Sequence, residues 1–417
     1  MAVSARAPGS LYDHPERWRF AGSMEGVPDW IDPAETGEER AGRAAWRARG
    51  NELFAGLGAL LPGLVIALGL AVIGRAASQA IGAGALGLEH SPISPILLAI
   101  LAGLAIRNTI GLPATYEPGL RLCLKRILRV GVALLGIRLS LGAVGIIGLA
   151  ALPIVVGCIV TALLLVSWIS RAVGLPRRLG TLIAVGTAIC GNTAIVATGP
   201  VIHADEDEIS YAVGTITVFG LFALVTYPFV SHLLFAGDST LAGFFLGTAI
   251  HDTAQVAGAG LLYAQQYAAP ETLDTATVTK LVRNLFMVAV IPIMALVHHR
   301  SAAQPAARKP SLKQMVPVFV FGFVAMALLR TIGDLGEAPF AGLLTSAQWN
   351  AGIGFVSVLS AWCLTVAMAS VGLGTNLRRL QNLGLKPLGV GLAAALTVGG
   401  VSAGLIHVLA SWMTRLT

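Results

Sequence analysis

Charged side chains are scarce in this chain of 417 residues, since Asp, Glu, Lys and Arg together make up 12%, and aromatic residues make up only 6%. Apolar residues account for 55%, and the mean hydropathy is +0.78. These values lie outside the range of soluble globular domains. The composition therefore predicts an integral membrane protein.

Cysteine is rare as well, and its spacing excludes two kinds of site. The four cysteines fall in or at the edge of apolar segments, with no CxxC spacing: Cys123, Cys158, Cys190 and Cys363. A disulfide framework and a zinc site are both excluded by this pattern. We expect small reduced core residues instead, and no bound metal.

Signatures of soluble enzymes and of nucleic-acid binding are missing. The chain has no GxSxG, no HExxH and no Walker A loop, so we expect neither an enzyme nor a resident cofactor, and ATP-driven transport by this chain alone is disfavoured. The net charge of +7 is spread over connecting loops without a nucleic-acid-binding motif. We therefore expect no nucleic-acid partner.

Long apolar runs dominate the chain after residue 50. A spanning helix needs about 20 apolar residues, which predicts an all-α membrane protein of about eleven transmembrane helices: 53–74, 94–110, 122–140, 149–170, 180–202, 209–232, 241–262, 278–297, 315–331, 349–375 and 388–412. Residues 51–417 form the expected transporter domain. Residues 1–50 are rich in arginine and lack a signal-peptide pattern, which predicts a cytoplasmic arm.

The distribution of basic residues predicts the orientation. Most of the 28 Lys and Arg residues fall in the arm or in loops assigned to the cytoplasm, such as that of Arg177 and Arg178. Loops assigned to the outside are acidic, as at 205–208. The pattern predicts a multi-pass protein of the bacterial inner membrane with its N-terminus in the cytoplasm.

Two segments nearly repeat one another: GTAICGNTAIVATG at 186–199 and GTAIHDTAQVAGAG at 247–260. The alignment places Asn192 against Asp252. Each segment is a break rich in glycine within an apolar run, where exposed main chain is tolerated only if it lines a cavity. Discontinuous helices of this kind build the substrate sites of transporters.

A second pair of similar segments indicates internal duplication. PILLAILAGLAIRNTIG from Pro95 aligns with PVFVFGFVAMALLRTIG from Pro317, and VALLGIRLSL from Val132 corresponds to MASVGLGTNL from Met368. These partners lie seven spans apart, which predicts inverted repeats over about 94–232 and 241–412. The two GTAI segments lie only two spans apart, so the second half is permuted, or one segment is a re-entrant hairpin, or their likeness is local.

The breaks supply the candidate binding residues. Free N–H groups and unwound carbonyls there could hold a small anion or a cation. The candidates for substrate binding are Gly186, Thr187, Cys190, Gly191, Asn192, Thr193, Gly247, Thr248, Thr253, Gln255, Arg283 and Asn284. The alternative is that these small residues only let helices pack closely.

Ionisable residues inside the bilayer are usually functional. Asp252 is the acidic side chain expected deep in the membrane, and His251 is the histidine expected there. Both are candidates for ion coupling, through a proton or Na⁺; the alternative is a capping Asp and a His bonded to a carbonyl. In the next helix Arg283 is a counter-charge for Asp252 or a docking point for an anion, whereas Lys280 can reach the interface.

Four motifs together resemble a known family: GTAICGNTAIVATGPVI, GTAIHDTAQVAGAG, KLVRNLFMV and MASVGLGTNLRRL are similar to the sulfate exporter family of bacterial membrane proteins, over residues 50–417. That family is grouped with the cation/proton antiporter and anion transporter superfamily. The resemblance implies inverted repeats, discontinuous crossing helices, a dimerising scaffold and elevator-type movement.

The expected function is secondary transport. We expect export of a small anion, a sulfate- or sulfite-like oxyanion or an organosulfonate, coupled to H⁺ or Na⁺ and carried by a homodimer. A cation/proton antiporter is the first alternative, although Asn192 stands where an electrogenic antiporter often has a second acid. An intramembrane enzyme using His251 and Asp252 is the second alternative.

Overall fold

The chain folds into helices. The computed structural model describes residues 44–85, 91, 93–299, 318–335, 339–376 and 385–416, and in these ranges every regular element is helical. Six of the described helices are long and apolar enough to cross a membrane: Gly58–Gly82, Leu141–Ala172, Glu206–Leu234, Pro270–His298, Ser346–Gly374 and Lys386–Ser411. The prediction of an all-α membrane protein is confirmed. Residues 1–43 of the expected arm lie outside the described ranges.

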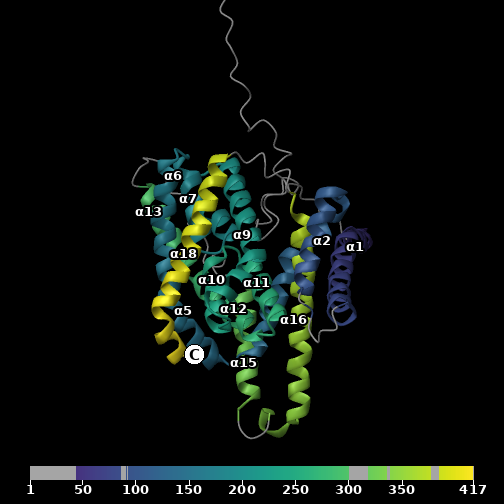
Figure 1. Ribbon diagram of the computed structural model, residues 1–417. Helices are drawn as coiled ribbons and strands as arrows, with labels where there is room; N and C mark the ends of the chain where they lie inside the picture. Colours follow the sequence, from purple (N-terminus) through teal and green to yellow (C-terminus); the bar gives the residue numbers. More distant parts are fainter. Residues whose placement is uncertain are drawn as a thin grey trace, which may run out of the picture.

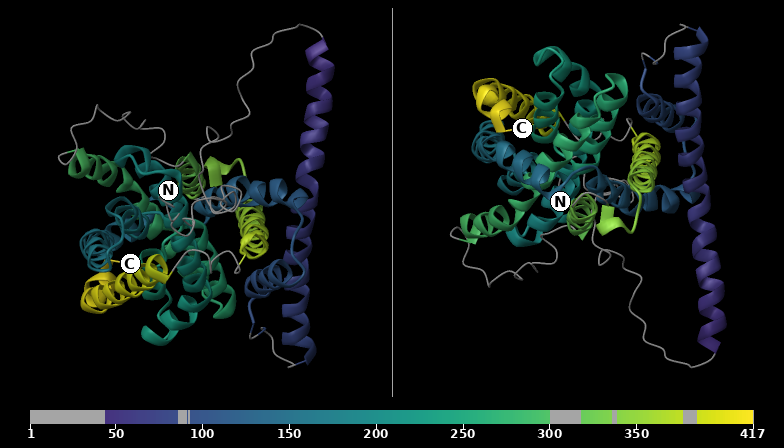
Figure 2. Two further views of the ribbon diagram at one scale, coloured as in Figure 1. Left: turned by 90° about the horizontal axis from the view of Figure 1, so that it is seen from above. Right: turned by 90° about the horizontal axis from the view of Figure 1, so that it is seen from below.

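The helices form two groups (Figure 1). The scaffold group consists of α1 (Ala44–Gln79), α2 (Pro95–Thr109), α3 (Glu117–Leu122), α4 (Leu128–Leu135), α15 (Val318–Gly333) and α16 (Ser346–Gly374). Its apolar contacts include a buried cluster of Ala67, Ala99, Leu120 and Val366 from four of these helices. Figure 2 shows α1 along one edge of the molecule, far from α18.

The hairpin group contains the remaining helices. It consists of α5 (Leu141–Thr161), α6 (Ser167–Ala172), α7 (Arg177–Ala188), α8 (Asn192–Thr198), α9 (Glu206–Leu234), α10 (Ser239–Ala249), α11 (Thr253–Gln266), α12 (Pro270–Leu285), α13 (Met287–His299) and α18 (Leu385–Leu416). A large buried apolar cluster runs through this group and continues into α2, α4, α15 and α16 of the scaffold group.

Residues 180–202 do not form the single spanning helix that we expected. The chain turns back at Gly191, which has a φ of 69°, so that α8 returns along α7. A Cβ on Gly186 would lie 2.7 Å from the Cδ1 of Ile195, nine residues further on. Arg178 at the start of α7 interacts electrostatically with Glu208 at the start of α9. Helices α7 and α8 are therefore a re-entrant hairpin, hairpin 1.

Residues 241–262 also turn back instead of crossing. The Thr272 hydroxyl near the start of α12 donates to the carbonyl of Ser239 at the start of α10, at 2.8 Å. His232 at the end of α9 stacks on Tyr267 just after α11, with ring centroids 3.7 Å apart. The starts of α10 and α12 and the ends of α9 and α11 therefore lie at one end of the molecule, and α10 with α11 forms hairpin 2.

Hairpin 1 and hairpin 2 enter from opposite ends, because α9 crosses between them. We call these the α7 end and the α12 end, after the helix that begins at each. The acidic residues 205–208 lie at the α7 end beside Arg178, so our prediction that they face away from Arg177 and Arg178 is wrong. The expectation of crossing helices is replaced by two hairpins whose glycine-rich turns meet.

Candidate functional site at the hairpin tips

The tips are short non-helical turns rich in small residues. In hairpin 1, Ile189, Cys190 and Gly191 separate α7 from α8; in hairpin 2, Ile250, His251 and Asp252 separate α10 from α11. A Cβ built on Gly191 would lie 3.3 Å from both the Cα and the Oδ2 of Asp252. The two tips are therefore in direct contact.

We expect Gly191→Ala to destabilise this contact. Gly191 has a φ of 69° and a ψ of −120°, a conformation that strains an alanine by roughly 1–3 kcal/mol, and the new methyl group would press on Asp252. The melting temperature of the purified protein in detergent should fall. Gly404→Ala is the matched control, because a Cβ there meets nothing within 4 Å. Equal melting temperatures for the two variants would contradict the prediction.

Two cations of α12 hold the carbonyl groups of both tips. The Lys280 ammonium donates to the carbonyls of Ile189 and Ile250, both at 2.9 Å, and to that of His251. The Arg283 guanidinium donates to the carbonyl of Ala188 at 2.8 Å and to that of Thr248 at 2.5 Å. It also donates to the carbonyls of Thr187 and Ile250.

These contacts explain why both side chains are fully buried. The last carbonyls of a helix carry a partial negative charge and lack intrahelical partners. Lys280 and Arg283 supply donors and positive charge to the ends of α7 and α10 at once. Our prediction that Lys280 reaches the interface is therefore wrong, and Arg283 is committed to main-chain carbonyls.

Asp252 caps the returning helix of hairpin 2. Its Oδ1 accepts the N–H of Ala254 at 2.8 Å, as expected for the residue before a helix. Its Oδ2 is buried and makes no hydrogen bond of good geometry, and neither do the side-chain oxygens of Asn192 and Asn284; the main-chain N–H groups of Gln255 and Asn192 also lie near the carboxylate. Three buried oxygens at the tips are thus available to accept a hydrogen bond or a cation.

The amide groups of the site are held by neighbours. Asn284 donates to the hydroxyl of Thr253 at 3.1 Å, and Asn192 donates to the hydroxyl of Thr217 at 3.3 Å. Gln255 donates to the carbonyl of Thr217, also at 3.3 Å. Thr217 was not among the predicted site residues, and its polar side chain within the apolar run of α9 was the available signal.

Other expected residues lie near the tips in different roles. Thr248 bonds to Ser402 at 2.6 Å, and Gly247 packs against Thr279. The Cys190 thiol lies 3.8 Å from the sulfur of Met287. Both ring nitrogens of His251 are buried without partners. The remaining predicted residues also lie in hairpin 1: Gly186 packs on Ile195, the Thr187 carbonyl accepts from Arg283, and Thr193 is half-buried.

The break also places the candidate residues of hairpin 2 on two different helices. Thr248 belongs to α10, whereas Asp252 and Gln255 belong to the cap and first turn of α11. Among the described residues, no cluster of three or more His, Cys, Asp or Glu side chains could hold a metal ion.

The site carries an excess of positive charge. Lys280, Arg283 and Asp252 are each 0% exposed, so that two cations face one carboxylate. The paired helix starts and helix ends of the two hairpins contribute opposite partial charges that roughly cancel. Since unpaired buried charge is costly, the site favours an additional anion.

Proteins similar to this chain occur in several bacteria. A family model described as "Conserved hypothetical protein 698" matches residues 62–391. A UPF0324 membrane protein of Agrobacterium fabrum is 34% identical over 84% of this chain and 93% of its own length. One from Fusobacterium nucleatum is 31% identical over 77% and 92%, and one from Streptococcus mutans is 31% identical over 78% and 92%.

Proposed function

The chain belongs to the family described as Conserved hypothetical protein 698, and we propose that this membrane protein is a secondary transporter of a small anion, coupled to H⁺ or Na⁺. The cargo is a sulfate- or sulfite-like oxyanion or an organosulfonate, held where the hairpin tips meet. The protein works as a homodimer in the bacterial inner membrane, with its N-terminus in the cytoplasm and net export as the direction.

One observation carries this proposal: two re-entrant hairpins from opposite ends meet at a fully buried cluster with one more cation than carboxylate. Non-helical main chain at such depth is tolerated where it lines a cavity or is buried in protein. Lys280 and Arg283 hold the tips together. An anion at the start of α11, beside Asn192 and Thr253, would complete the charge balance.

Repeated glycine contacts in the scaffold group favour inverted repeats, which the family resemblance associates with elevator-type movement. A Cβ on Gly372 of α16 would lie 2.3 Å from the carbonyl of Ile100 in α2, and one on Gly136 after α4 would lie 2.1 Å from the carbonyl of Phe323 in α15. Our alignment of the repeats pairs Gly136 with Gly372. The same glycine contact thus occurs twice between equivalent helices, in keeping with inverted repeats and with a permuted order of elements.

The coupling ion has a candidate site of its own. Asp252, Asn192 and Asn284 each present a buried oxygen without a partner, and carboxylate and amide oxygens are the ligands that hard cations prefer. A proton bound to the Asp252 carboxylate could be the coupling ion equally well. His251, adjacent to Asp252, has both ring nitrogens free to take part.

Proteoliposomes containing the full chain and a trapped pH dye provide the test. We expect uptake of radiolabelled sulfate or sulfite that accelerates when a pH or Na⁺ gradient is imposed, with liposomes lacking protein as the control. Anion flux that ignores both gradients, or no anion flux at all, would contradict the proposal.

The same unpartnered oxygens favour a second candidate, the monovalent cation/proton antiporter. It predicts dye responses to Na⁺ or K⁺ with no transportable anion present. The excess positive charge at the tips weighs against it, since a further cation bound without an anion would raise that excess. An intramembrane enzyme is the weakest candidate, because the nearby nucleophile, Cys190, lies against Met287.

A further inference from the structure

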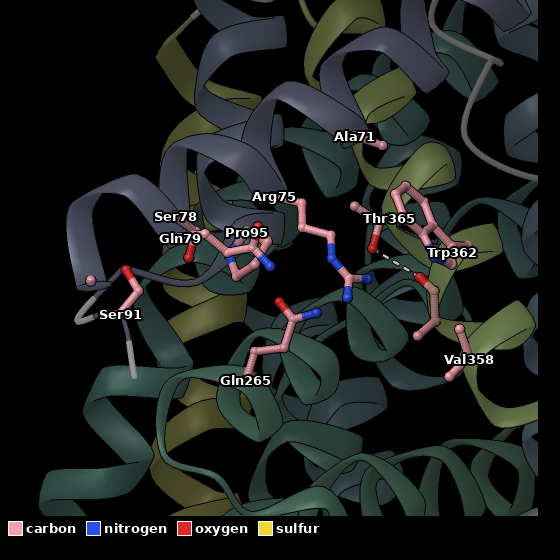
Figure 3. A pocket seen from close by; sticks show the side chains of 12 residues that line it. Ala71, Arg75, Ser78, Gln79, Ser91, Pro95, Gln265, Val358, Trp362 and Thr365 are labelled. Atoms are coloured by element: carbon pink, nitrogen blue, oxygen red, sulfur yellow. Dashed lines mark hydrogen bonds between the residues drawn. The ribbon is translucent and has the colours of Figure 1, made fainter. Parts of the chain in front are cut away.

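A pocket of about 400 Å³ opens at the α12 end, away from the hairpin tips. It lies between the scaffold group and the end of hairpin 2 (Figure 3), and its described lining includes Arg75 and Ser78 of α1, Trp362 and Thr365 of α16, and Gln265 of α11. It therefore joins three helices that belong to both groups.

Arg75 is the charged residue among the described lining residues. Its guanidinium carbon lies 5.4 Å from the centre of the Trp362 ring, so that the ring covers one face of the cation. Among the described residues it has no ion pair. The edge of the guanidinium, which carries the N–H donors, points into the pocket (Figure 3).

Gln265 adds a second donor. Its side-chain oxygen accepts the Ser94 hydroxyl at 2.8 Å and the N–H of Ile96 at 3.4 Å, which fixes the orientation of the amide. The amide nitrogen is then left to donate into the pocket, toward the guanidinium of Arg75 (Figure 3). The hydroxyls of Ser78 and Thr365 donate to main-chain carbonyls, so the donors that face the pocket come from Arg75 and Gln265.

We propose that this pocket binds an oxyanion, a sulfate- or phosphate-type group, between the guanidinium of Arg75 and the amide of Gln265. The Arg75 guanidinium and the Gln265 amide present N–H donors in fixed positions. Such donors suit the oxygens of a sulfate or phosphate group, because a guanidinium binds oxyanions through two parallel hydrogen bonds. The group comes either from a free ion or from the headgroup of an anionic lipid. This site is distinct from the hairpin tips and does not depend on their function.

The test compares wild-type protein with Arg75→Gln, Arg75→Lys and the control Arg171→Gln. Arg171 is exposed and bonds within its own helix. In one arm, inorganic sulfate is titrated into delipidated protein in detergent and the melting temperature is followed. In the other, protein from nanodiscs of phosphatidylcholine with one-fifth phosphatidylglycerol is analysed by native mass spectrometry for retained lipid.

We expect Arg75→Gln to weaken one of these two interactions at least tenfold, since a charge-assisted hydrogen bond contributes about 1.5–3 kcal/mol. Arg75→Lys should recover part of it, and Arg171→Gln should match the wild type. Loss in the sulfate arm identifies a free ion, and loss in the lipid arm identifies a headgroup. Equal behaviour of wild type and Arg75→Gln in both arms overturns the proposal. Sulfate bound at the hairpin tips would stabilise wild type and Arg75→Gln equally, so the difference between these two proteins reports on the pocket alone.

Discussion

Replacing Arg283 by Met lowers the stability of the protein by about 3–5 kcal/mol, because several buried carbonyls lose a charged donor at the same time. The guanidinium donates to carbonyls from both hairpins, those of Thr187, Ala188, Thr248 and Ile250. Methionine fills a similar volume but donates nothing. The carbonyls at the ends of α7 and α10 then lose donors in a region without water, which costs about 1–3 kcal/mol for each group left unsatisfied.

The melting temperature in detergent measures this effect, and Arg330→Met is the matched control. Arg330 pairs with Asp334 one turn further along a partly exposed helix, and exposed pairs of this kind contribute only about 0–1 kcal/mol. The melting temperature of Arg283→Lys should lie between those of the wild type and Arg283→Met, because an ammonium keeps the charge but lacks the planar set of donors. If Arg283→Met has the same melting temperature as Arg330→Met, Arg283 does not hold the tips together.

The sequence predicted that both GTAI segments are helix breaks, but not the topology of the helices around them. The paired GTAI segments, Asn192 and Asp252 lie at the two tips, which meet. Hydropathy measures only the length of an apolar run, and a run of about 20 residues fits one spanning helix or two half-length helices equally well. Charge misled as well: the distribution of basic and acidic residues assigned Arg178 and Glu208 to opposite sides, whereas they lie at the same end.

The role of α12 could not be predicted. Lys280 and Arg283 lie three residues apart in one helix, but their partners are main-chain carbonyls, which no feature of the side-chain composition reveals. The carbonyl of Ala188 is 95 residues away from Arg283, and only the meeting of the two hairpins brings it close. A sequence pattern could show that these charges lie deep in the membrane, but not that they stabilise helix ends.

Asp252→Asn gives the second large effect, on transport and not on folding. Asparagine caps helices about as well as aspartate, so its side-chain oxygen can still accept the N–H of Ala254. The change removes the carboxylate charge and replaces the unpartnered Oδ2 by a donor. We therefore expect near-normal stability but anion flux that no longer responds to pH or to Na⁺.

Flux in proteoliposomes, measured over a range of pH and of Na⁺ concentration, checks this expectation. Asp205→Asn is the matched control, because Asp205 also caps a helix, α9, but is exposed at the α7 end. That variant should keep the wild-type responses. If Asp252→Asn keeps them too, coupling does not involve this carboxylate. Its role is then to cap α11, and the coupling ion binds elsewhere.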